Sequence, residues 1–133
     1  IFEILYLSDL ASFFECLNTD VRITIMKDLD LYDKAIDSNS ELLSFIIYTI
    51  KTLRNCLAHN SIIFDTRFKD RDISKVLKKW VEKETNIKNI TLYSLIDYII
   101  IICCVLKRID FSGKRANALL EQYKNQNQIL SNF

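Results

Sequence analysis

The residues of this sequence that are best suited to chemistry lie together near its middle. Arg54, Asn55 and His59 fall within six consecutive residues, and His59 is the one histidine of the 133-residue chain. Histidine titrates near neutral pH and suits proton transfer, and arginine can bind a phosphate through two parallel hydrogen bonds. These groups are a minimal set for cleaving an RNA phosphodiester through its own 2′-hydroxyl, a reaction that needs no metal ligand.

The spacing of these residues fits the end of a helix. Asn55 and His59 are four residues apart and therefore share one helix face. Arg54 is offset from His59 by about 140° around a helix, and its long side chain can still reach the same site. A single histidine near a helix C-terminus is also commonly a structural residue that the helix dipole stabilises. Both interpretations of His59 are open at this point.

The composition indicates the fold class that must position these residues. The chain has one Gly and no Pro, 50% of its residues are hydrophobic and 26% are charged. Sandwiches, barrels and α/β folds need many Gly- and Pro-rich turns, so an all-α fold is expected. We predict one helical domain over residues 1–133 with five to six helices. Because the first residue is Ile1 and not Met, we expect the chain to be a fragment of a longer protein.

Apolar residues recur at helical spacing along most of the sequence. They predict helices over 1–18, from about 20 to 36, over 41–59, across the lysine-rich segment that ends near Lys83, over 92–109 and over 114–129. Residues 60–70 have no clean periodicity and are predicted to be a loop. Trp80, Cys103 and Cys104 are expected in the core.

Charge and cysteine content suggest where the protein acts. Residues 1–50 carry a net charge of −6 and residues 51–133 a net charge of +7. This asymmetry either indicates a basic surface that attracts polyanions, or only reflects solvated helix faces on which the two signs of charge are unevenly distributed. The four cysteines form no metal-binding pattern, which fits a reducing cytoplasm. The longest apolar run, Tyr98 to Leu106, has nine residues, whereas a membrane span needs about 20. No metal, no cofactor and no membrane contact are expected.

Three segments resemble a known family. The sequence Arg54-Asn55-x-x-Ala58-His59-Asn60 resembles the R-x4-H motif of HEPN-domain ribonucleases, in the form found in Abi (abortive infection) proteins of the AbiD/AbiF type. Residues 1–14 resemble the F-E-x-L segment that precedes this motif in the family, and residues 63–68 resemble the stretch that follows it. The chain is thus similar to the C-terminal portion of such a protein.

The resemblance implies a metal-independent endoribonuclease of the bacterial cytoplasm that acts in phage defence or as a toxin. It also implies a HEPN-like helical bundle in which two motif helices, one from each protomer of a homodimer, form a composite site. His59 would be the general acid or base, Arg54 would bind the scissile phosphate, and Asn55 would orient His59 or hold the helix end. Asn60 stands where relatives often have a second histidine, so one catalytic histidine per protomer is expected.

Further polar residues around the motif are candidates for RNA contacts. The RNA-binding set comprises Lys51, Asn60, Arg67, Lys69 and Arg71. Tyr48, Phe64 and Phe68 could stack on a base, although aromatic residues of this kind more often pack in the core. The expected partners are substrate RNA, a second copy of the chain, and a neutralising antitoxin or small RNA.

Two other functions compete with the nuclease. One is a catalytically inactive HEPN module that binds RNA or a protein partner. The other is a helical dimerisation domain in which Arg54 and His59 only cap and pair. A 2′,3′-cyclic phosphate product formed in EDTA would distinguish the nuclease from both.

Overall fold

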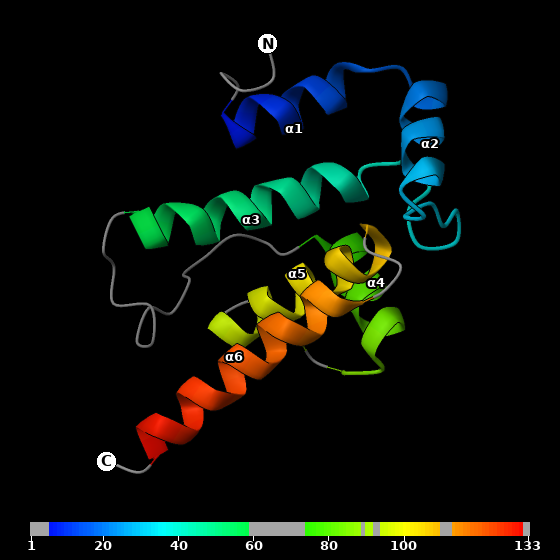
Figure 1. Cartoon of the computed structure of the whole chain (residues 1–133). Helices are drawn as coiled ribbons and strands as arrows, with labels where there is room; N and C mark the ends of the chain where they lie inside the picture. Colours follow the sequence, from blue (N-terminus) through cyan, green and yellow to red (C-terminus); the bar gives the residue numbers. More distant parts are fainter. Residues whose placement is uncertain (1–5, 59–73, 89, 92–93, 110–112, 132–133) are drawn as a thin grey trace.

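The structure, a computed structural model, is all-helical over the residues it describes, which are 6–58, 74–88, 90–91, 94–109 and 113–131. This confirms the predicted fold class. Within these residues there are six helices and no strand: α1 (Leu7–Cys16), α2 (Thr19–Asp28), α3 (Leu42–Ala58), α4 (Lys75–Thr85), α5 (Leu95–Ile109) and α6 (Lys114–Ser131). Helix α3 is the central element, because it contacts α1, α4 and α5. Figure 1 shows α1 along one side of α3 and the α5–α6 pair on the other side.

The core lies between α3, α4 and α5 and confirms the predicted burial of Trp80 and of the two adjacent cysteines. The main hydrophobic cluster contains residues from α1 to α5, and a smaller hydrophobic cluster lies between α5 and α6. Cys104 belongs to the main cluster and Cys103 to the smaller one. Burial raises the pKa of the Cys104 thiol to about 11, as expected for an inert core cysteine.

Helix α2 is shorter than predicted. Asn18 caps its start, accepting a hydrogen bond from the Val21 N–H at 3.0 Å. The prediction that the helix continues to about Ile36 is wrong, because α2 ends at Asp28. Asp30 adopts the left-handed conformation with φ 53°, and the Leu31 N–H donates back to the Met26 carbonyl at 2.8 Å. This is a Schellman termination, which buries Leu31 against the core.

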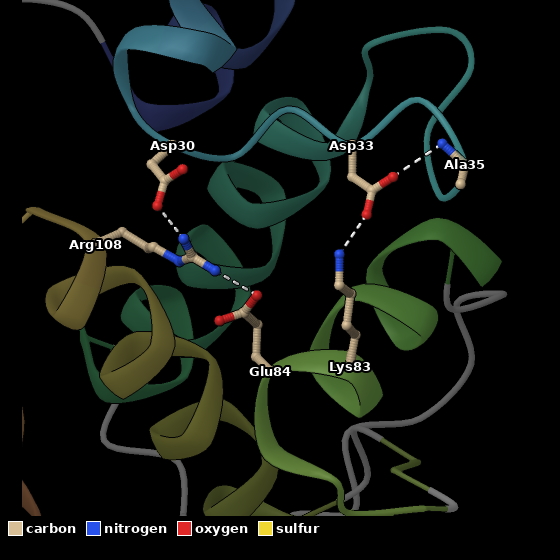
Figure 2. Close-up of polar contacts among 6 residues, drawn as sticks. All are labelled: Asp30, Asp33, Ala35, Lys83, Glu84 and Arg108. Carbon is tan, nitrogen blue, oxygen red and sulfur yellow. Dashed lines mark hydrogen bonds and ion pairs between the residues drawn. The ribbon is translucent and has the colours of Figure 1, made fainter.

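Ion pairs hold the segment after α2 against α4 and α5. Figure 2 shows Arg108, at the end of α5, between Asp30 and Glu84, and its Nη2 lies 2.5 Å from Glu84 Oε1. Lys83 of α4 pairs with Asp33 at 2.5 Å. Desolvation opposes the charge on Arg108, but the hydrogen bonds to the two carboxylates outweigh it and raise its pKa. These contacts fix the end of the molecule at which α3 begins.

The start of α3 is fixed by a buried carboxylate. Asp37 is buried, and its Oδ2 accepts a hydrogen bond of 2.7 Å from the Leu42 N–H, the first residue of the helix. A carboxylate at a helix N-terminus satisfies an otherwise unpaired N–H and interacts favourably with the helix dipole. From this anchored start, α3 runs without interruption to Ala58, so the residues near its C-terminus lie on a rigid element.

Candidate functional site

Three of the candidate site residues lie in the last two turns of α3. These are Lys51, Arg54 and Asn55. Arg54 lies about 18 Å along the helix axis from Leu42, at the end of α3 opposite the ion pairs. The other candidates lie outside the residues that the structure describes, and they are His59, Asn60, Arg67, Lys69 and Arg71.

Arg54 is exposed and is hydrogen-bonded to its neighbour. Its Nη1 donates to Asn55 Oδ1 at 3.2 Å. Lys51 and Arg54 are the charged residues of α3, which contains no acidic residue between Leu42 and Ala58. The C-terminal half of this helix therefore presents positive charge with no carboxylate of its own to neutralise it, as a phosphate-binding surface requires.

The opposite face of α3 is part of the core. Leu53 is buried, and Cys56 packs on the same cluster as Tyr98 of α5. Burial raises the pKa of Tyr98 to about 12. This packing fixes the rotation of α3 about its axis and directs Arg54 and Leu57 to solvent, where Leu57 remains 52% exposed.

Helix α1 pairs with α3 in antiparallel orientation (Figure 1). Ser12 Oγ lies 3.2 Å from the Tyr48 hydroxyl, and the same hydroxyl donates to Glu15 at 3.5 Å. Tyr48 is thus half-buried between two helices, in agreement with the packing interpretation of this residue. The antiparallel pairing brings the start of α1 to the Arg54 end of α3, so Tyr6, which directly precedes α1, lies at that end of the helix pair. Spacing along the chain carries no signal for this arrangement.

Helix α4 lies in the lysine-rich segment that was predicted to be helical, and it has a basic outer face. Its Ser74 cap accepts a hydrogen bond from the Val76 N–H at 3.2 Å. Leu77 and Trp80 are buried, whereas Lys75 and Lys79 are exposed. Lys83 is held by Asp33 at the end of the molecule where α3 begins, so this lysine lies away from Arg54.

Two general properties of the described residues concern metal-ion binding and membrane spanning. They contain no group of three or more His, Cys, Asp or Glu side chains that could hold a metal ion. Among the same residues, no helix is long and apolar enough to cross a membrane.

Comparison with known proteins gives one family. Residues 1–65 match the family model described as Abi-like protein. The matched segment includes α1, α2 and α3 and extends through Arg54, Asn55 and His59. No curated protein and no solved structure matches the chain.

Proposed function

We propose that this chain, which is an Abi-like protein by its first 65 residues, is a metal-independent endoribonuclease with a HEPN-type site. The Abi-like family is associated with abortive infection. The chain would act in phage defence, within an abortive-infection system or as a toxin. The observation that carries the proposal is the arrangement at the end of α3. There an exposed Arg54, hydrogen-bonded to Asn55, stands on a helix free of acidic residues, five residues before the one histidine.

The reaction follows from the chemistry of these groups. The RNA 2′-oxygen attacks the adjacent phosphorus and loses its proton, while the bond from phosphorus to the 5′-oxygen breaks and that oxygen gains a proton. The products are a 2′,3′-cyclic phosphate and a 5′-hydroxyl. His59 would transfer a proton, and Arg54 would neutralise the phosphate. Asn55 would orient Arg54, because the hydrogen bond between them holds the guanidinium.

A second copy of the chain would complete the site. One histidine per protomer can serve as base or as acid in a given step, and the reaction uses both. One side of α3 supports such an interface: Ile47, Ile50, Arg54 and Leu57 recur at spacings of three and four residues, and of these Arg54 and Leu57 are exposed whereas the two isoleucines are half-buried. Exposed apolar residues mixed with arginine are typical of protein interfaces. We propose that the twofold axis of a homodimer lies beside this face.

The proposal is tested by the reaction product and by one variant. The full chain is incubated with RNA in excess EDTA, and the cleaved ends are analysed for 2′,3′-cyclic phosphate. His59→Ala should lower the cleavage rate by about 10²- to 10⁴-fold while RNA affinity and thermal unfolding stay those of the parent. Asn125→Ala, at an exposed position of α6, is the control.

Each result discriminates between functions. Full activity of His59→Ala would overturn the assignment of the site. Unfolding of that variant would favour a structural histidine. RNA binding by the parent without any cleavage would favour the inactive binding module.

A further inference from the structure

Tyr6 is the most exposed large hydrophobic side chain among the described residues, with 71% of its surface accessible. It directly precedes α1, and its carbonyl accepts hydrogen bonds from the Asp9 and Leu10 N–H groups at 2.9 and 3.1 Å. The backbone of Tyr6 is therefore fixed by the first turn of the helix. An aromatic ring that projects into solvent from an ordered backbone is a surface on which a planar group can stack.

The register of α1 against α3 places Tyr6 level with Arg54. Ser12 contacts Tyr48, and Tyr6 precedes Ser12 by six residues, as Arg54 follows Tyr48 by six. Each separation amounts to about 9 Å along its helix axis. Because the two helices are antiparallel (Figure 1), both displacements lead toward the same end of the pair.

The hydrogen bond to Asn55 directs the Arg54 guanidinium toward α1. Asn55 follows Tyr48 by seven residues, which is nearly two full helical turns, so the two residues point in directions about 20° apart around the helix axis. It therefore lies on the side of α3 from which Tyr48 contacts α1. Since Arg54 donates to Asn55 at 3.2 Å, its charge is drawn to the same side of the helix, at the level of Tyr6.

An exposed aromatic ring at the same level of a helix pair as an exposed guanidinium resembles the combination that proteins use for single-stranded nucleic acid, with the base on the ring and the phosphate on the cation. We infer that Tyr6 is the base-stacking residue of the RNA site, and that the substrate is single-stranded RNA with an unpaired base next to the scissile phosphate. The inference rests on the proposed function. Asp9, in the first turn of α1, fits this arrangement because the uncharged base would lie on the α1 side and the phosphate on the α3 side.

The test measures affinity for RNA that cannot be cleaved. Fluorescence anisotropy follows the binding of a short, labelled, single-stranded RNA with 2′-O-methyl groups to the full chain. Tyr6→Ala should raise Kd about 5- to 150-fold, and Tyr6→Phe, which keeps the ring, about twofold at most. Phe13→Ala is the matched control, because Phe13 is also an exposed aromatic residue of α1, 52% accessible, but lies about 10 Å further along the helix.

A second measurement identifies the stacked base. RNAs of the same length are prepared with one base removed at successive positions. At one position, removal of the base should weaken binding to the parent by as much as Tyr6→Ala weakens binding to the intact RNA. Removal of the same base should cause no further loss of affinity in Tyr6→Ala. Such non-additivity is the mark of a direct contact.

The outcomes separate this inference from the proposed function. An unchanged Kd in Tyr6→Ala, with weaker binding in Arg54→Ala, would overturn the stacking role and leave the nuclease standing. Equal losses in Phe13→Ala, or a shift of Tyr6→Ala from dimer to monomer in light scattering, would also overturn it. Cleavage that survives His59→Ala would overturn the nuclease site alone. A parent chain that binds no RNA would overturn both.

Discussion

Arg54 donates a hydrogen bond from Nη1 to the side-chain oxygen of Asn55, its neighbour along the chain, at 3.2 Å. Consecutive residues of a helix point about 100° apart, so this contact requires the arginine side chain to bend across the helix surface. A bent, hydrogen-bonded guanidinium has fewer rotamers to lose when it binds a phosphate. In the proposed site, Asn55 would therefore position Arg54, and this role can be measured.

Asn55→Ala should weaken RNA binding by about 2- to 10-fold, because one hydrogen bond contributes roughly 0.5–1.5 kcal/mol. The loss should vanish when Arg54 is already Ala, since Asn55 acts through Arg54. A double-mutant cycle measured by anisotropy checks this, with Asn117→Ala on the exposed side of α6 as control. An equal loss in both backgrounds would contradict the positioning role.

Leu57→Lys should weaken the proposed homodimer by about tenfold or more, because it places a charge in the apolar part of the proposed interface. Leu57 is 52% exposed, so the free energy of unfolding should change by no more than about 0.5 kcal/mol. Light scattering over a concentration series gives the dimer affinity. The comparison is Ile87→Lys, which alters another exposed apolar residue, following α4. A dimer that tolerates Leu57→Lys would place the twofold axis elsewhere.

Lys83→Met should lower stability at neutral pH, and the difference from the parent should shrink in acid. The hydrogen bond from Lys83, and then that from the Ala35 N–H, lower the pKa of Asp33 below its ordinary value of 3.8. A carboxylate with a lowered folded-state pKa stabilises the protein above its unfolded pKa, and this contribution is lost as pH falls through the folded pKa. Urea denaturation between pH 7 and pH 2.5 measures the difference, with Lys79→Met as control. A difference that does not vary with pH would exclude the Asp33 contact as its cause.

Arg108→Met should lower the free energy of unfolding by about 1 kcal/mol, the upper range for ion pairs near the surface. Methionine keeps most of the apolar stem, so the change reports mainly on the two carboxylate contacts. Glu84→Gln should cost more than Asp30→Asn, because the Glu84 side chain is mostly buried and that of Asp30 is largely exposed. Lys107→Met, one residue away and exposed, is the control in thermal and urea unfolding. Equal effects of Arg108→Met and Lys107→Met would show that the bridge contributes nothing.

Thiol labelling of the native protein at pH 8 should modify Cys16 quickly and leave Cys103 and Cys104 unmodified until the protein unfolds. Cys16 is exposed, whereas burial raises the pKa of Cys103 and brings that of Cys104 to about 11. Since the thiolate is the reactive form, both access and ionisation protect the buried pair. Cys16→Ser should remove the fast phase seen by mass spectrometry. Rapid labelling of Cys104 in the folded state would show that α5 is not packed as described.

The helical class and much of the core could be predicted from the sequence because both depend on local patterns. One glycine and no proline leave few sites for tight turns, and apolar residues three and four apart select the face that must be buried. Trp80 and Cys104 lie on such faces, and both are buried. The candidate group of Arg54, Asn55 and His59 is likewise a local pattern, since the three fall within six consecutive residues.

The end of α2 and the surroundings of Arg54 were decided by tertiary structure. Leu29, Tyr32 and Ile36 continue a helical spacing past Asp28, but the burial of Leu31 and the left-handed Asp30 end the helix. Arg108 contacts Asp30 from 78 residues away, and Tyr6 reaches the level of Arg54 only because α1 packs antiparallel on α3. Periodicity specifies which face of a helix is buried; which helix covers that face, and in what register, depends on packing between segments distant in the chain.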